Sequence, residues 1–295
     1  MFETSGRWSL IIHGGAKEIA PDEEADNRSG CAEAAAAGAA ILSQGGSALD
    51  AVEAAIRVLE ARPVFNAGLG SVLNEEGEVE MCAALMDGAT LDVGAVGVIM
   101  GVAHPVSVAR KLVRETPILL AGEGAFKFAR DHHAELVAPD ALITRKAAKD
   151  LQEAHDTVGA VAMDRKGDFA AGTSTGGLSG AAKGRMGDSA LPGCGYYADN
   201  HLGAVALSGH GEGIARLAAA AQIMGAIKGK DPEGAIAGAL GQMKRVGGDA
   251  GGIALDAAGR MGWWHNSPDF AVGLIDSEMK EPLVWLRKEE EAARG

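Results

Sequence analysis

The apolar positions of the first sixty residues form one short run and two helical stretches. The run 8–16, WSLIIHGGA, is largely apolar and ends in a glycine pair before its last residue, which predicts a buried strand that enters a tight loop. Residues 31–46 are rich in alanine and also end in two glycines, a pattern typical of a helix with a glycine stop. Ser47 then caps a second helix, whose apolar residues recur at helical spacing until Pro63 stops it.

The middle of the chain mixes strands and helices. The apolar runs 79–86 and 91–100 are joined by an Asp-Gly turn, which predicts a pair of strands. The segment 132–144 is the most linker-like part of the chain. The other elements expected here are a helix over 105–115, a strand over 118–122 and helices over 123–131 and 145–154.

Strands dominate the second half. Residues 158–174 and 251–266 each contain strand, Asp-x-x-Gly turn and strand, so the same hairpin is expected twice. Between the hairpins we expect a strand over 204–209 and helices over about 212–227 and 232–244. Grouped strands and helices, rather than strict alternation, favour an α+β fold in which helices cover a sandwich of sheets.

Composition narrows the class of protein. The chain has 295 residues, of which 47% are hydrophobic, enough for a core without disulfides. Its net charge is −13 and its basic residues are scattered, which argues against nucleic acid or membranes as partners. Three cysteines without C-x-x-C spacing suggest neither a disulfide framework nor a zinc site. With no targeting or membrane-spanning pattern in the sequence, we expect a cytoplasmic protein.

The candidate chemistry lies near the middle of the chain. The segment HDTVGAVA at 155–162 places Thr157 at the head of a strand, and TSTGG at 173–177 and GRMGDS at 184–189 follow it. A threonine hydroxyl is a weak nucleophile unless a base takes its proton, and an N-terminal threonine carries that base as its own α-amine. The layout therefore suggests a threonine that works after the chain is cut in front of it.

The same region offers groups that could bind an amino acid. Arg185 presents a fork that matches a carboxylate, and Asp188 can bind an ammonium group. The glycine-bounded loops 173–177 and 208–212 could supply oxyanion donors. Taken singly, each feature also has a structural explanation, because threonines often open strands and GRMGD is often a turn with a surface ion pair.

Together these motifs resemble the plant-type (type III) L-asparaginase/isoaspartyl peptidase family of N-terminal nucleophile (Ntn) hydrolases. The resemblance extends over most of the chain, through IIHGGA at 11–16, VFNAGLG at 64–70, LMDGATLDVGAVGV at 85–98, GGDAGGIALD at 247–256 and HNS at 265–267. It implies one Ntn-hydrolase domain over 1–295, a four-layer αββα sandwich that cleaves itself between Asp156 and Thr157. The products would be an α subunit, 1–156, with a linker near 132–156, and a β subunit, 157–295, assembled as a homodimer of αβ heterodimers.

The resemblance also implies roles for individual residues. Thr157 would be the nucleophile and, through its freed amine, the base, with the hydroxyl of Thr175 beside it. Arg185 would bind the substrate α-carboxylate and Asp188 its α-ammonium group. The remaining implied site residues are Asn66, which supports the site, Ser208 and Gly209, which form the oxyanion pair, and Gly211, which lines the pocket.

No cofactor is implied for the reaction, but a structural sodium ion is. The segment LEARPVFNAGL resembles the sodium loop of the family, in which backbone carbonyls hold the ion. Oxygen ligands of this kind suit an alkali cation. By spacing, the carbonyls would belong to Leu59, Glu60, Arg62, Phe65, Ala67 and Leu69.

Four positions depart from the pattern of the family. Ser208 stands where threonine is usual, which keeps the hydroxyl but removes the methyl that restricts its rotamer. Asp156 stands where these asparaginases often have glycine, a feature of the glycosylasparaginase branch, in which that carboxylate takes part in processing. Cys82 and Ala181 replace residues that are often Asp and Lys.

The expected activity is hydrolysis of the side-chain amide of L-asparagine and of β-aspartyl (isoaspartyl) dipeptides. The substrate would be a small molecule. Two alternatives stay open at this point. One is a glycosylasparaginase-like amidase acting on N4-glycosyl-asparagine, and the other is a non-catalytic aspartate-binding protein that retains Arg185 and Asp188.

Overall fold

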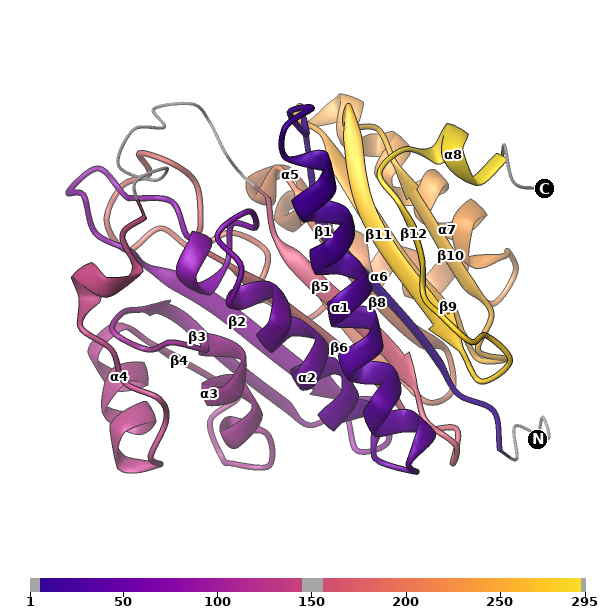
Figure 1. Ribbon diagram of the computed structural model, residues 1–295, viewed down its shortest axis with the longest axis horizontal. Coiled ribbons are helices and arrows are strands. Elements are labelled where there is room, and N and C mark those ends of the chain that lie inside the picture. The colour runs from indigo at the N-terminus through magenta and orange to yellow at the C-terminus, as the bar shows by residue number, and fades with distance from the viewer. Residues whose placement is uncertain (1–5, 145–155, 293–295) are drawn as a thin grey trace.

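The larger of two sheets has eight strands. The computed structural model describes residues 6–144 and 156–292 (Figure 1). The strand order is β12-β11-β1-β5-β6-β2-β3-β4, and all neighbours are antiparallel except β3 and β4. The strands are β1 (Ser9–Lys17), β2 (Met81–Asp87), β3 (Val93–Ile99), β4 (Leu119–Ala121), β5 (Val158–Met163), β6 (Phe169–Thr175), β11 (Asp269–Asp276) and β12 (Leu283–Trp285).

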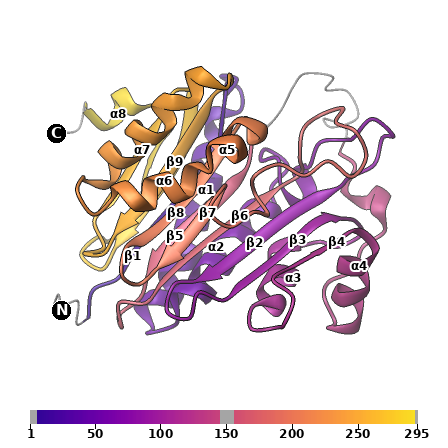
Figure 2. The ribbon, with the colours of Figure 1, turned by 180° about the vertical axis from the view of Figure 1, so that it is seen from behind.

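The smaller sheet has four antiparallel strands in the order β10-β9-β8-β7. It faces the middle of the large sheet, with β8 packed against β5 and β6, and β9 against β1 (Figure 2). Its strands are β7 (Tyr196–Asp199), β8 (Gly203–Gly209), β9 (Ala250–Asp256) and β10 (Met261–His265).

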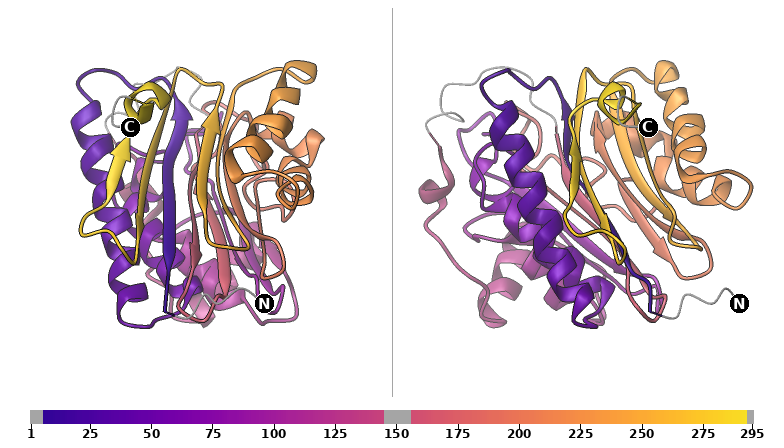
Figure 3. Two further views of the ribbon diagram at one scale, coloured as in Figure 1. Left: turned by 90° about the vertical axis from the view of Figure 1, so that its right-hand side faces the viewer. Right: turned by 45° about the vertical axis from the view of Figure 1, so that its right-hand side comes forward.

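Helices cover the outer faces of both sheets. The indigo-to-magenta helices lie against the large sheet and the orange helices against the small one, with the sheets between them (Figure 3). On the large sheet these are α1 (Glu24–Ser43), α2 (Ala48–Glu60), α3 (Pro105–Leu112) and α4 (Gly122–Asp131). Those beyond the small sheet are α5 (Gly211–Leu217), α6 (Ala219–Ala226) and α7 (Pro232–Leu240), while α8 (Lys288–Ala292) follows β12. Short 3₁₀ turns occur at Gly68–Gly70, Pro139–Leu142 and Gly241–Arg245.

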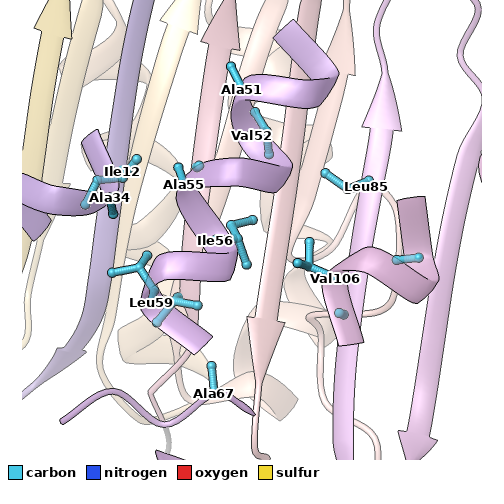
Figure 4. Close-up of a cluster of buried hydrophobic side chains, with 14 of the residues drawn as sticks. Ile12, Ala34, Ala51, Val52, Ala55, Ile56, Leu59, Ala67, Leu85 and Val106 are labelled. Atoms are coloured by element: carbon cyan, nitrogen blue, oxygen red, sulfur yellow. The ribbon is translucent and has the colours of Figure 1, made fainter. Parts of the chain in front are cut away.

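Three hydrophobic clusters fill the spaces between these elements. Because side chains alternate across a strand, Leu10 and Ile12 of β1 pack toward the helices, while Ile11 between them packs toward the small sheet. In β8, Ala206 belongs to the cluster between the sheets and Leu207 to the cluster beneath α6 and α7. Figure 4 shows part of the first cluster, where the buried face of α2 meets the large sheet. Alanine is frequent in all three clusters, and its small side chain allows the layers to pack closely.

Several predicted elements are confirmed. The strands predicted over 79–86 and 91–100 are the antiparallel pair β2 and β3, and both Asp-x-x-Gly hairpins form, as β5–β6 and β9–β10. Ser47 caps α2, because its side chain accepts a hydrogen bond from the backbone N–H of Asp50. These signals are local in sequence, so they survive tertiary packing.

Other predictions were wrong in extent. The strand at 8–16 does not turn into a loop at its glycines but continues to Lys17 through a bulge between His13 and Gly15. The helix expected over 31–46 begins at Glu24, and the one over 212–227 is broken at Ala218, which has a left-handed backbone.

The expected helices over 105–115 and 232–244 end earlier, at Leu112 and Leu240. The predicted linker 132–144 contains a 3₁₀ turn and a bridge from Leu136 to Val102. Strands β7, β11 and β12 were not predicted, and the helix expected over 145–154 lies outside the described residues. Within 6–144 and 156–292, no helix is both long and apolar enough to cross a membrane.

Candidate active site

The pairing of the central strands places Thr157 at one end of the large sheet. Strand β5 begins immediately after Thr157, and its residue Val158 lies opposite Ser174 of β6. Because the two strands are antiparallel, Thr157 and Thr175 reach the same end of the sheet. Strand β8 packs against β5 from the small sheet and brings Ser208 to this position. Residues from both sheets therefore meet at one peptide bond, between Asp156 and Thr157.

The carbonyl oxygen of that bond is held by two donors. Asn66 Nδ2 and Thr175 Oγ1 each donate to Asp156 O, both at 3.1 Å. Asn66 is itself fixed, because its Nδ2 donates to Gly177 O at 2.8 Å and its Oδ1 accepts from Val72 N at 3.1 Å. Thr175 Oγ1 accepts from Gly177 N at 3.0 Å, which leaves its proton for Asp156. Two oriented donors on one carbonyl oxygen are suited to stabilise negative charge on it.

Two serine hydroxyls contact Thr157, which is almost fully buried. Its backbone N–H donates to Ser208 Oγ at 3.0 Å, and its own Oγ1 lies 3.0 Å from Ser189 Oγ. Ser208 Oγ also accepts from the N–H of Ala16, at 2.9 Å. The nitrogen and hydroxyl of Thr157 are therefore both held by serines that follow it in sequence, and Ala16 of β1 contacts one of them.

A pocket opens beside the Thr157 hydroxyl. Gly209, at the end of β8, has a φ of +132°, and a side chain there would collide with the carbonyl of Asp249, so this position requires glycine. The small residues keep the pocket open beside the polar groups. Its lining residues are Thr157, Thr175, Gly177, Arg185, Gly187, Asp188, Ser189, Gly209 and Gly211.

Asp188 is a buried carboxylic acid on the wall of this pocket. Burial raises its pKa to about 7, although the nearby guanidinium of Arg185 acts in the opposite direction. Within residues 6–144 and 156–292, its Oδ2 has no hydrogen-bond partner. A buried carboxylate oxygen without a partner is costly, so a ligand with an ammonium group would be stabilised here.

Arg185 also lines the pocket and is oriented by Glu212. Its Nε and Nη2 donate to the two carboxylate oxygens of Glu212, at 2.8 Å and 2.7 Å. The same contact lowers the pKa of Glu212. Glu212 occupies one edge of the guanidinium, and a second carboxylate can be bound at the edge formed by Nη1 and Nη2.

His13 lies behind the site on β1. Complete burial lowers its pKa to about 3, so the ring is neutral at physiological pH, and it packs 5.3 Å from the ring of Phe270. A neutral imidazole with so low a pKa supplies no positive charge to the site and is a weak base.

Known proteins resemble this chain over most of its length. The profile of the protein family described as Asparaginase matches residues 6–156 and 148–284. The chain belongs to this family. A Xenopus laevis protein named isoaspartyl peptidase/L-asparaginase is 44% identical over 266 residues, which cover 85% of this chain and 86% of that protein. Proteins of the same name from Danio rerio and Homo sapiens are 44% and 42% identical, over 85% of this chain and 86% and 87% of their own lengths.

The structure brings the residues predicted from the asparaginase family to one place. Asn66 and Ser208 lie behind the pocket and contact the Asp156–Thr157 peptide. Ser208, expected in the oxyanion pair, contacts the nitrogen of Thr157, while the Asp156 carbonyl is held by Asn66 and Thr175. The predicted residues that line the pocket are Thr157, Thr175, Arg185, Asp188, Gly209 and Gly211.

Sequence reasoning assigned no role to Ser189 or Glu212, although Ser189 ends the motif GRMGDS and Glu212 ends the glycine-bounded loop 208–212. The sequence did contain a signal for both, because Ser189 directly follows Asp188 and Glu212 directly follows Gly211. Of the positions that depart from the asparaginase pattern, Cys82 lies opposite Thr175 in the sheet, and burial raises its thiol pKa.

A second pocket adjoins the first. It shares Gly177 and Arg185 with the first pocket, and Asn74, Glu80 and Ala181 also line it. Ala181, one of the positions expected to depart from the asparaginase pattern, contributes only a methyl group to the wall of this pocket.

The predicted sodium loop starts at the end of α2 and runs next to the site, where its residue Asn66 contacts the Asp156–Thr157 peptide. The carbonyls of Leu59, Arg62, Phe65 and Ala67 each accept a backbone hydrogen bond from within this segment. The loop closes so tightly that a side chain at Gly70 would collide with the Phe65 carbonyl oxygen. The carbonyls of Arg62, Phe65 and Ala67 each have a second lone pair, and backbone oxygens are ligands that fit an alkali cation.

Proposed function

We propose that this chain is an isoaspartyl peptidase and L-asparaginase, an enzyme that hydrolyses the side-chain amide of asparagine and the β-aspartyl bond of isoaspartyl dipeptides. One observation carries the proposal: the hydroxyl of Thr157 lines the same pocket as Arg185 and Asp188. A nucleophile is thus paired with a cation and an acid that can bind the two charged groups of an amino acid. The names of the relatives from Xenopus laevis, Danio rerio and Homo sapiens support the same activity.

We infer that the chain first cuts itself between Asp156 and Thr157, giving subunits 1–156 and 157–295. In an N→O acyl shift, Thr157 Oγ bonds to the Asp156 carbonyl carbon, the C–N bond breaks and the Oγ proton passes to the nitrogen. Water then hydrolyses the ester. The contacts of Asn66 and Thr175 to the Asp156 carbonyl oxygen support this step, because the two donors would stabilise the tetrahedral oxyanion.

The cut would leave an α-amine on Thr157, with an unperturbed pKa near 7.7–8.0 and therefore able to act as base. Ser208 Oγ lies 3.0 Å from this nitrogen and would orient it. Thr157 Oγ would then attack the substrate amide carbon, ammonia or an amine would leave, and water would release aspartate from the ester. Arg185 and Asp188 would hold the aspartyl end, while the adjoining pocket gives room for the leaving group.

We further infer the four-layer αββα arrangement of Ntn hydrolases for the fold. Its support is the position of the three hydrophobic clusters: helices against the large sheet, sheet against sheet, and the small sheet against helices. The carbonyls of the loop after α2 would hold a sodium ion with a structural role.

The decisive experiment is a denaturing gel of the purified chain after prolonged incubation. We expect two bands, each about half of the 30.0 kDa chain, with Thr157 at the new N-terminus of one fragment. The variant Thr157→Ala should remain a single band and should release no ammonia from L-asparagine. A full-length wild-type band with undiminished activity would contradict the mechanism. Comparing a β-aspartyl dipeptide with N4-glycosyl-asparagine as substrates then separates this function from that of a glycosylasparaginase.

A further inference from the structure

The side chain of Asp156 occupies a place that the fold has prepared for it. It is 2% exposed, although Asp156 lies outside the helices and strands, two residues before β5. Gly15 on β1 makes the space, because a Cβ at this residue would lie 2.7 Å from Asp156 Cβ and 2.8 Å from its Oδ2. Gly15 also has a φ of +114°, a conformation that other residues rarely adopt. The carboxylate of Asp156 therefore fits against β1 only at a glycine.

Lys17 supplies the opposite charge. Its Nζ lies 2.8 Å from Asp156 Oδ2, and its side chain is 18% exposed. The same Nζ donates to Val64 O at 2.9 Å and lies 5.9 Å from the centre of the Phe65 ring. The ammonium group is thus held in place by its hydrogen bond to Val64 O and lies within ion-pair distance of Asp156. Because the carboxylate is almost fully buried, losing this partner would leave a buried charge without compensation.

Asp156 is therefore held at both ends. Lys17 binds its side chain, while Asn66 and Thr175 hold its carbonyl oxygen, and Ser208 contacts the nitrogen that follows. We propose that Lys17 is the positioning residue for self-cleavage: it binds the Asp156 carboxylate and so fixes the scissile carbonyl between its oxyanion donors, in front of the Thr157 hydroxyl. This role rests on the proposed self-cleavage, and Lys17 takes no part in the bond changes themselves.

Two other basic residues in the described part of the chain near this site make different contacts. His13 is near Asp156 but neutral, because its pKa is lowered to about 3 by burial. Arg62, the basic residue nearest in sequence to Asn66, has its ion pair with Glu33 instead. Both members of the pair lie next to motifs of the site. Lys17 directly follows HGGA, and Asp156 directly precedes Thr157.

The test follows the rate of self-cleavage of freshly translated chain in a cell-free reaction, sampled over time on a denaturing gel. Lys17→Met should cut at least about tenfold more slowly than the wild type, a barrier increase of ~1.4 kcal/mol. Lys17→Arg, which keeps the charge, should recover most of the rate. Lys288→Met is the matched control, because Lys288 is also ion-paired, at 3.0 Å from Glu233, and lies over a ring, that of Trp263, away from Asp156. It should cut at the wild-type rate.

A double-mutant cycle separates positioning from general destabilisation. If Lys17 acts through the carboxylate of Asp156, then Lys17→Met should have little further effect in an Asp156→Gly background. Equal slowing in both backgrounds, or wild-type cutting by Lys17→Met, would overturn the role of Lys17 while leaving the proposed function intact. A wild-type chain that never cuts would overturn the proposed function, and this inference with it.

Discussion

Asp188 gives the site a pH dependence of its own. With its pKa raised to about 7 by burial, the acid is mostly protonated below that pH and ionised above it. Only the ionised form attracts an ammonium group. For the matured enzyme we expect kcat/KM for L-asparagine to rise with pH up to about 7 through this residue, by about tenfold per pH unit below the pKa.

The amine of Thr157 titrates in a neighbouring range, so the measurement needs a reference substrate. Succinamate is asparagine without its α-amino group. Its hydrolysis should depend on the Thr157 amine but not on Asp188. The ratio of kcat/KM for asparagine to that for succinamate isolates the contribution of Asp188. A ratio that stays flat from about pH 5.5 to 7 would show that Asp188 does not titrate as its burial indicates.

The residues of the site were predicted unevenly from sequence. Thr157, Arg185 and Asp188 could be found because they lie in short motifs whose residue types match the chemistry. The contacts of Lys17 with Asp156 could not, because they join a strand end to a position far along the chain. Such pairs are fixed by tertiary packing, and no local pattern in a single sequence records them.

At the scale of elements, the break between α5 and α6 contains a residue with an unfavourable backbone conformation. Ala218 is exposed and has a left-handed conformation, with φ of 48°, which an L-residue other than glycine adopts only at a cost. Gln222 Nε2 donates to the carbonyl of Leu217 at 2.6 Å and so supports the break. Ala218→Gly should therefore raise the free energy of unfolding by about 0.5–1 kcal/mol. This figure is the strain relieved at residue 218 minus the cost of the larger entropy of glycine in the unfolded chain.

The matched control is Ala221→Gly. Ala221 is exposed in the helical part of α6, where glycine should lower the free energy of unfolding by about 1 kcal/mol. Urea unfolding of both variants in a Thr157→Ala background compares them in one uncut chain. If both substitutions destabilised the protein to the same extent, the left-handed backbone at Ala218 would not be a source of strain.

The elements themselves were predictable where the signal is local. The two hairpins were predicted from their Asp-x-x-Gly turns, and α2 from its serine cap. The start of α1 at Glu24 and the continuation of β1 through its glycines were missed, because both depend on packing against β11. Such boundaries depend on pairing between distant strands, and a pattern of about a dozen residues holds no information on that pairing.

The whole molecule interleaves the two segments that the proposed cut would create. In the large sheet, β1 lies between β11 and β5, and β2 pairs with β6. Groups of strands from before Thr157 therefore alternate with groups from after it. Separating the fragments would break three rows of backbone hydrogen bonds at once. We expect the cut fragments to elute together in size-exclusion chromatography, at the volume of uncut Thr157→Ala, and to part only in denaturant. Fragments that eluted separately in native buffer would contradict this.

The position of β1 also sets an order of events during synthesis. Gly15 and Lys17 are made among the first residues, yet β1 is framed by β5 and by β11, which ends at Asp276. The place for the Asp156 side chain is therefore incomplete until almost the entire chain has left the ribosome. A nascent chain that has just passed Thr157 has a nucleophile and a bond to cut, but not the strand arrangement that aligns them. If the chain cuts itself as proposed, this topology would delay the cut until both fragments can be retained in one sheet.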